Sequence, residues 1–255
     1  MINHARIVQF PRNAGDCKRC QRAQKCLGLG LATSEAADLL DISARPKLLK
    51  RGEKLFNDGD EFSTLYAVRS GAVKTYKTTS EGEEQIIDFH LPGDLIGLNA
   101  IAGEHHPCHA VALDTTSVCA IDFHDVMRLC GKSTRMQHAF LKRVSSCMAR
   151  DEQFVVTLGT KDATQRLAAF LLALSQYHEE NGFSATEFSL PMSRTDIANY
   201  LSLAVETVSR IFSRLQREGV ISVERNAVSV TDLDHLYRAA GQIRRSGPRQ
   251  RSVVQ

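Results

Sequence analysis

The sequence predicts an α+β protein with an N-terminal jelly-roll-like β-roll, a long helix and a C-terminal winged helix-turn-helix. Three observations lead to this prediction. Between residues 46 and 125, glycines recur mostly seven to twelve residues apart and separate short alternating runs, which is typical of antiparallel strands. From about residue 124 there is no proline until Pro191, and apolar side chains recur at helical spacing. Residues 193–219 then read as two helices, followed by two short alternating runs.

The composition is that of an ordinary globular protein. Of 255 residues, 43% are hydrophobic and 24% are charged, which excludes wholesale disorder, collagen and a disulfide scaffold. The longest apolar run, 167–174, is far shorter than the roughly 18–20 residues that span a bilayer. The first fifteen residues hold charges and Pro11 where a signal peptide needs an apolar core. We therefore expect a cytoplasmic protein with no membrane partner.

Charge is distributed unevenly along the chain. The net charge of +3 is too small to indicate nucleic-acid binding by itself. Residues 1–30 carry six basic side chains and one acidic side chain, whereas residues 53–104 are rich in acidic ones. This contrast predicts that the basic N-terminal arm, residues 1–30, and the β-roll, residues 31–125, have separate roles.

Short runs of strand-favouring residues make up the predicted β-roll. We expect strands at 65–68, 72–76 and 117–121, because these runs are rich in β-branched and aromatic side chains. The sequence Leu91-Pro92-Gly93-Asp94 has the composition of a turn. The fold expected for this part is therefore an antiparallel sandwich or roll.

A long helix is predicted over residues 126–160, where apolar residues follow steps of three, four or seven and share one stripe. We expect the stripe to pair with its copy in a homodimer; the alternative is a helix that packs only on its own β-domain. Asp151 lies on the stripe, where two like charges would weaken the dimer, unless it simply faces water. The predicted dimer residues are Met136, Phe140, Val144, Cys147, Met148, Asp151 and Phe154.

The C-terminal part is predicted to be a separate domain over residues 161–234. A helix at 163–177 and a short strand at 188–191 precede the helix-turn-helix, which we place at about 193–217. Beyond this domain, residues 235–255 are expected to form a C-terminal helix and a frayed tail.

The predicted helix-turn-helix has recognisable ends. Ser193 or Thr195 is positioned to cap the first helix, and Gly219 is positioned to end the second. The runs 220–223 and 228–230 then read as the hairpin of a winged helix.

The second helix of this pair carries residues suited to reading DNA. Glu206, Ser209 and Arg210 stand at i, i+3 and i+4, so they point the same way. A carboxylate accepts from cytosine, an arginine grips guanine, and a small hydroxyl fits between them. Arg214 and Arg217 suit phosphate contacts. The alternative is an amphipathic hairpin in which Glu206 and Arg210 form only a surface ion pair.

Three of the seven cysteines, Cys17, Cys20 and Cys26, lie within ten residues of one another. In a reducing cytoplasm such a cluster indicates metal binding or redox chemistry, and thiolates select zinc or iron–sulfur clusters. A closed site of either kind needs a fourth ligand. Spacing alone leaves this ligand open among the following residues: Cys108, Cys119, Cys130, Cys147, His105, His106 and His109.

The helix-turn-helix sequence Val205-Glu-Thr-Val-Ser-Arg210, following a glycine-punctuated β-roll and a long helix, resembles the CRP/FNR family of bacterial transcription regulators over nearly the whole chain. The pattern Glu-x-x-Ser-Arg is similar to the FNR branch, whose dimers bind TTGAT-N4-ATCAA-like sites. The resemblance implies that Glu206, Ser209 and Arg210 read bases. The run 116–121, Thr-Ser-Val-Cys-Ala-Ile, resembles the strand that supplies the fourth ligand in that branch. Cys119 would thus complete one 4Fe-4S cluster per chain.

The same resemblance implies how the protein works. Cluster-loaded protein would dimerise and bind DNA, and oxygen would convert the cluster and release monomers. Activation would require contact with RNA polymerase through a weakly marked loop, Glu83-Glu84-Gln85-Ile86-Ile87-Asp88. A zinc- or thiol-dependent regulator of the same fold that does not sense oxygen in this way is the alternative.

Two other functions are disfavoured by the residues. The β-roll is of the kind that often holds a cyclic nucleotide, but the stretch 103–110 lacks the Arg and Ser that would bind its phosphate. No nucleophile–base pair, phosphate-cradling glycine loop or paired carboxylates point to catalysis. We therefore expect neither a cyclic-nucleotide ligand nor an enzyme.

Overall fold

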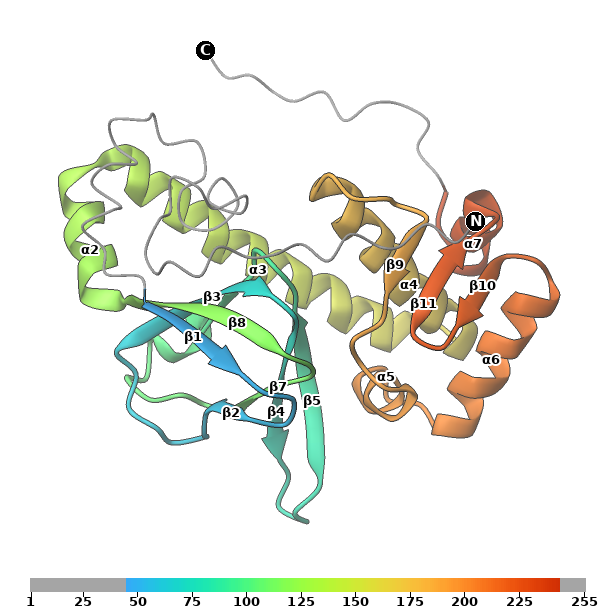
Figure 1. The fold of residues 1–255 in the computed structure, drawn as a ribbon, viewed down its shortest axis with the longest axis horizontal. Helices are drawn as coiled ribbons and strands as arrows, with labels where there is room; N and C mark the ends of the chain where they lie inside the picture. Colours follow the sequence, from blue (N-terminus) through green and yellow to red (C-terminus); the bar gives the residue numbers. More distant parts are fainter. Residues whose placement is uncertain (1–44, 244–255) are drawn as a thin grey trace, which may run out of the picture. The chain divides into compact units, whose positions relative to one another are not determined.

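The computed structural model describes residues 45–243, which fall into two compact units. The first unit ends at Ser146 and the second begins at Cys147; both are drawn in Figure 1. The basic arm with Cys17, Cys20 and Cys26 and the predicted C-terminal tail lie outside the described residues. Within residues 45–243, every helix is too short or too polar to cross a bilayer.

The first unit is an antiparallel sandwich of two four-stranded sheets, as predicted. One sheet has the order β1-β8-β3-β6, with bounds Arg45–Leu49, Thr116–Asp122, Thr64–Ser70 and Leu95–Ile96. The other has the order β2-β7-β4-β5, with bounds Lys54–Phe56, His109–Ala112, Val73–Thr78 and Glu84–His90. The predicted strands at 65–68, 72–76 and 117–121 therefore correspond to β3, β4 and β8, and a short 3-10 helix, η3 (Leu98–Ala100), follows β6.

Two apolar clusters hold this unit together. The first joins residues of both sheets, among them Val68, Val73 and Val118, and forms the interior of the sandwich. The second joins Leu65 and Ile121 on the other face of the β1-β8-β3-β6 sheet to residues of the following helices. The first sheet is therefore covered on both faces, which makes alternate positions along β3 and β8 apolar on each side.

The predicted single helix is divided in two by Ser133. Helix α2 (Phe123–Lys132) is capped by Asp122, whose carboxylate accepts from the backbone N–H groups of His124 and Asp125. Ser133 is extended, with φ −135°, and its hydroxyl accepts from the backbone N–H of Met136 at 3.2 Å. A second helix, α3, then runs from Thr134 to Thr160. Val126 and Leu129 of α2 share one buried cluster with Met136 and Phe140 of α3, so the apolar spacing of three, four or seven continues across the break.

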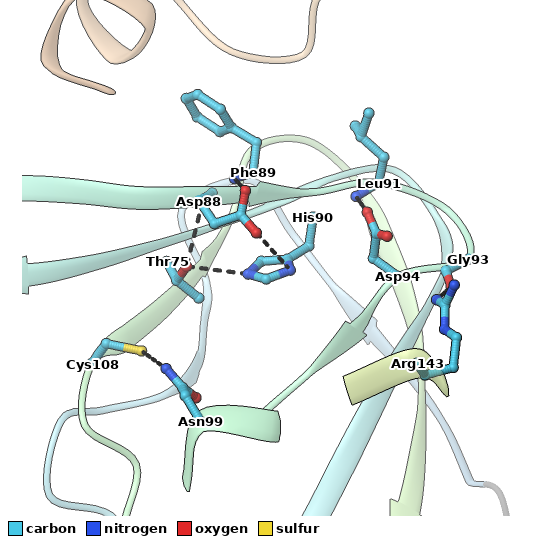
Figure 2. A network of polar contacts seen from close by, with 10 residues as sticks. All are labelled: Thr75, Asp88, Phe89, His90, Leu91, Gly93, Asp94, Asn99, Cys108 and Arg143. Atoms are coloured by element: carbon cyan, nitrogen blue, oxygen red, sulfur yellow. Dashed lines mark hydrogen bonds and ion pairs between the residues drawn. The ribbon is translucent and has the colours of Figure 1, made fainter. Parts of the chain in front are cut away.

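A network of polar contacts lies around the turn between β5 and β6 (Figure 2). The turn is closed by Asp94, whose carboxylate accepts from the backbone N–H of Leu91 at 2.9 Å. Arg143 of α3 donates to the carbonyl oxygen of Gly93 at 2.6 Å. This bond fixes the first half of α3 to the β-roll of the same unit.

In the second unit, helix α4 (Ala163–Glu180) begins with a capping box between Asp162 and Gln165. Helices α5 (Arg194–Tyr200) and α6 (Val205–Arg217) follow at the predicted helix-turn-helix. Strands β9, β10 and β11 form a three-stranded antiparallel sheet, and α7 comes last. Their bounds are Glu187–Ser189, Ile221–Glu224, Ala227–Val230 and Leu233–Ala239. The predicted wing is thus the β10–β11 hairpin.

Candidate nucleic-acid interface

Helix α6 separates its apolar and polar side chains onto two faces. Val208, Ile211, Phe212 and Leu215 are buried, whereas the three predicted base-reading residues are exposed. These exposed residues are Glu206, Ser209 and Arg210. The burial of one face fixes the helix on its domain, so the other face is presented as a rigid reading surface.

The first helix of the pair is set by a cap at Ser193. Its hydroxyl accepts from the backbone N–H of Asp196 at 3.0 Å, and the Asp196 carboxylate accepts from the backbone N–H of Ser193 at 2.9 Å. This reciprocal pair is a capping box. Of the two caps that the sequence allowed, the structure therefore has Ser193. Ser202, with φ 53°, makes the turn into α6.

Two of the three arginines of α6 donate to threonine hydroxyls. Arg210 donates to Thr207 at 3.2 Å, and Arg214 donates to Thr164 at the start of α4 at 2.6 Å. Arg210, Arg214 and Arg217 line, together with Thr164, a hollow of about 550 Å³ between these two helices. The hollow is bordered by cations and hydroxyls, which is the chemistry that a DNA backbone requires.

Arg194 was not predicted from the sequence as a site residue. It lies beside α6, the predicted recognition helix. Its guanidinium carbon is 3.0 Å from the centre of the Phe212 ring, and burial lowers the pKa of Arg194 to about 10. The side chain therefore packs on the buried face of α6 as a cation over an aromatic ring. The signal in the sequence that could have identified Arg194 is its position directly after the capping Ser193, in the helix that precedes the predicted recognition helix.

The cysteines of the first unit differ in access. Cys119 is partly buried on β8, opposite Pro46 of β1 and Ala67 of β3, and it packs at the edge of the cluster beneath α2 and α3. Cys108 is 1% exposed inside the sandwich and accepts from the Asn99 amide at 3.7 Å (Figure 2). Burial raises the pKa of the Cys108 thiol, so the thiolate that binds metal is disfavoured there. Among the described residues, no group of three metal-ligating side chains is found.

The predicted dimer stripe divides between two environments. Met136 and Phe140 are 2% and 8% exposed, and they pack in the cluster that covers the β-roll of the same chain, with Val144 partly buried beside them. Phe154 stacks on Tyr200 of α5, with ring centres 4.2 Å apart. These contacts differ from the predicted seam, because a helical period identifies an apolar face but not the surface that covers it.

A second stripe on α3 is apolar and exposed. Leu141, Met148 and Val155 are 56%, 59% and 69% exposed and are spaced seven residues apart, so they follow one line along the helix. Asp151 is exposed and falls between Met148 and Val155, while Cys147 is half-buried. Of the predicted dimer residues, the exposed stripe therefore includes Met148 and Asp151.

The loop expected to contact polymerase lies on the β4–β5 hairpin. Glu83, Glu84 and Gln85 are exposed and Ile87 is 39% exposed, but Ile86 is buried at 3%. Glu84 also lies 3.4 Å from the Lys74 ammonium. Asp88 is partly buried, and its carboxylate lies 3.9 Å from the His90 imidazole (Figure 2). The exposed part of this loop is therefore its tip.

Comparison with known proteins identifies the family to which this chain belongs. A family model described as a cyclic nucleotide-binding domain matches residues 46–133, and one described as a Crp-like helix-turn-helix domain matches residues 165–239. The fumarate nitrate reduction regulatory protein of Klebsiella oxytoca is 40% identical over 247 residues, covering 96% of this chain and 99% of that protein. This chain belongs to the CRP/FNR family. The fumarate and nitrate reduction regulatory protein of Escherichia coli K12 is 39% identical over the same coverage.

The CRP/FNR assignment agrees with the fold. The solved structure of FixK2 from Bradyrhizobium japonicum has a TM-score of 0.71 and 30% identity, covering 77% of this chain and 96% of that one. The expected resemblance, the fold class and the helix-turn-helix are confirmed. As a CRP/FNR protein with this recognition helix, the chain is a DNA-binding transcription regulator.

Two side chains of the stretch 103–110 pack against the β-roll itself. The ring of His106 is stacked on Phe56, with centres 3.6 Å apart, and Cys108 belongs to the sandwich interior. These side chains occupy the stretch that lacks the Arg and Ser needed to bind a nucleotide phosphate.

Proposed function

We propose that this chain is an oxygen-responsive transcription regulator whose 4Fe-4S cluster promotes dimerisation and DNA binding. The observation that carries the proposal is the contrast between Cys119 and Cys108. Cys119 is partly accessible on β8, next to the edge strand β1. The described chain begins in β1, where Arg45 and Pro46 pair with Ala120 and Cys119. This pairing at the start of the described chain supports the assignment of Cys119 to the same site as Cys17, Cys20 and Cys26, which precede β1 in the sequence.

The donor set fits an iron–sulfur cluster, since four thiolates are its usual ligands. Cys17, Cys20, Cys26 and Cys119 would hold the cluster, which supplies redox chemistry when bound. The protein's own contribution is position: Cys119 lies at the edge of the apolar cluster that includes Met136 and Phe140 of α3. A change in packing at Cys119 would therefore be transmitted through this apolar cluster to α3, the helix that we propose to dimerise. The names of the relatives, fumarate and nitrate reduction regulators, support a role in anaerobic or microaerobic gene control.

On DNA, we assign Glu206, Ser209 and Arg210 to base reading and Arg214 and Arg217 to phosphates. One recognition helix reads one half-site, so two copies must lie about one helical turn apart. A TTGAT-N4-ATCAA-like site meets this requirement. The tip of the β4–β5 hairpin, Glu83 to Gln85, is the surface that we assign to RNA polymerase, and we assign no cyclic nucleotide to the β-roll.

The dimer proposal uses the exposed stripe of α3. Leu141, Met148 and Val155 would pair with their copies, and Asp151 would lie between them. Two carboxylates in a poorly solvated seam repel each other. The dimer is then marginal, and a few kcal/mol from an ordered N-terminal arm decides its population.

The test compares Cys119→Ser with Cys108→Ser in anaerobically purified full-length protein. We expect wild type and Cys108→Ser to be brown, to contain iron and sulfide, and to bind a TTGAT-N4-ATCAA duplex until air is admitted. Cys119→Ser should be colourless and bind the duplex weakly. A colourless wild type with stoichiometric zinc and air-stable DNA binding would establish the alternative, a zinc-dependent regulator. Loss of the cluster in Cys108→Ser alone would reassign the fourth ligand.

A further inference from the structure

The tip of the β10–β11 hairpin carries an arginine in an unusual backbone conformation. Glu224 pairs with Ala227, so the loop consists of Arg225 and Asn226 alone. Arg225 has φ 56°, and it is one of three non-glycine residues with positive φ among residues 45–243. Tight hairpins need positive φ, but glycine, asparagine or aspartate normally supplies it.

This conformation is unfavourable for a residue with a Cβ atom, because Cβ approaches the following carbonyl oxygen. A glycine at position 225 would make the same turn without that strain. The side chain of Arg225 offers no compensation within the described chain: it is exposed and makes no hydrogen bond or ion pair there. Strain that persists without a local reason indicates that the side chain serves a function outside the fold.

The hairpin is attached to the side of the recognition helix. The backbone N–H of Val223, two residues before Arg225, donates to the Gln216 side chain of α6 at 3.1 Å. Gln216 is seven residues after Ser209, so both lie on the same side of α6. Beyond the tip, the carbonyl oxygen of Asn226 accepts from the backbone N–H of Leu190 at 2.7 Å. The loop backbone is therefore held at both ends.

Other parts of the domain therefore border the reading face of α6 at both of its edges. Gln216 lies at the edge marked by Ser209, and Arg214 lies beyond the edge marked by Arg210. Arg214 reaches Thr164 of α4 on one side, and Gln216 holds the β10–β11 hairpin on the other. DNA that lies against Glu206, Ser209 and Arg210 would extend its backbone past both edges. The exposed guanidinium at the hairpin tip is suited to a phosphate there, because its planar fork pairs with two phosphate oxygens.

We propose that Arg225 binds a DNA backbone phosphate beside the half-site, and that its strained conformation is kept for this contact. The proposal rests on the proposed DNA-binding function. A phosphate contact positions the protein without reading sequence. Removal of Arg225 should therefore weaken all sites about equally and leave the base preference unchanged.

The experiment uses full-length protein with Arg225→Gly, Arg225→Ala and Arg225→Lys. Binding to a TTGAT-N4-ATCAA duplex, to a duplex with one changed half-site and to random duplex is measured over a range of salt concentrations. We expect Arg225→Gly and Arg225→Ala to lower the slope of log K against log salt by about one per half-site, with an equal loss on all three duplexes. Arg225→Lys should keep most of the slope.

Thermal unfolding separates the contact from damage to the fold. Arg225→Gly should melt no lower than wild type, and higher than Arg225→Ala, because only glycine relieves the positive φ. Arg51→Ala, an exposed arginine of the first unit, controls for net charge and should leave the slope unchanged. Wild-type affinity and slope in Arg225→Gly would overturn the proposal, as would an equal slope change in Arg51→Ala. A wild-type protein that binds no duplex would instead overturn the proposed function.

Discussion

Single residues in this protein often combine a packing role with a chemical one, and His106 is the clearest case. Its ring is 2% exposed, stacked on Phe56 and edge-on to Phe62. Within the described chain, its Nδ1 atom is buried without a hydrogen-bond partner. Burial lowers the pKa of His106, while Asp60 acts weakly in the opposite direction. The folded β-roll therefore holds this ring neutral.

This pKa direction predicts loss of stability in acid. Below about pH 6.5 the unfolded chain gains a proton at this histidine that the folded chain does not, so the free energy of unfolding falls as pH drops through the folded pKa. His106→Phe should remove this contribution and flatten the profile between pH 7 and 5, measured by urea unfolding. His105→Phe, at an exposed position, should leave the profile unchanged. Parallel pH profiles for wild type and His106→Phe would contradict the prediction.

At the scale of elements, α5 shows how a short helix depends on its ends. It has seven residues, Arg194–Tyr200, and helices of this length do not form in isolation. The capping box of Ser193 and Asp196 satisfies backbone groups at its start, and Ile197 and Ala198 anchor it in the core. The recognition helix follows directly, so the cap also sets where α6 begins.

Ser193→Ala should therefore lower the free energy of unfolding of the DNA-binding unit by about 1 kcal/mol. Thr195→Ala is the matched control, because Thr195 is exposed and Ser193 occupies the cap; its effect should stay within about 0.5 kcal/mol. Urea unfolding of the full-length variants followed by circular dichroism measures both. Equal losses in the two variants would show that the hydroxyl of Ser193 is not the stabilising group.

Elements with local signatures were predictable from the sequence, and those defined by long-range packing were not. The cap at Ser193, the two helices of the pair and the glycine-bounded strands each depend on a few neighbouring residues. The break at Ser133 was missed because the apolar period continues through it. Met136 and Phe140 were assigned to a dimer because the period does not reveal that the β-roll of the same chain covers them.

The candidate sites likewise combine features that the local sequence predicts with features that depend on long-range packing. Exposure of Glu206, Ser209 and Arg210 follows from the period of α6. The burial of Cys108 was not predictable, because Cys108 lies just before β7 and its place in the sandwich interior depends on packing between the two sheets. The strain at Arg225 is equally invisible in the sequence, since a tight hairpin is normally indicated by glycine or asparagine at this position.

For the whole molecule, association and DNA binding should be linked through α3. The exposed stripe of Leu141, Met148 and Val155 offers apolar area for a partner, and Asp151 interrupts it. Because apolar burial favours the dimer and the paired carboxylates oppose it, small changes at Asp151 should shift the monomer–dimer equilibrium strongly. DNA binding should follow, since two half-sites need two recognition helices.

Asp151→Ala should therefore dimerise in air and bind the TTGAT-N4-ATCAA duplex without a cluster, as measured by sedimentation and by titration of labelled duplex. Glu179→Ala is the matched control: it removes an equal, exposed charge from a different helix, α4, so it should stay monomeric in air. Met148→Ala combined with Asp151→Ala should restore the monomer, because the apolar contact is then reduced. A monomeric Asp151→Ala protein, or equal dimerisation by Glu179→Ala, would show that this stripe of α3 is not the seam.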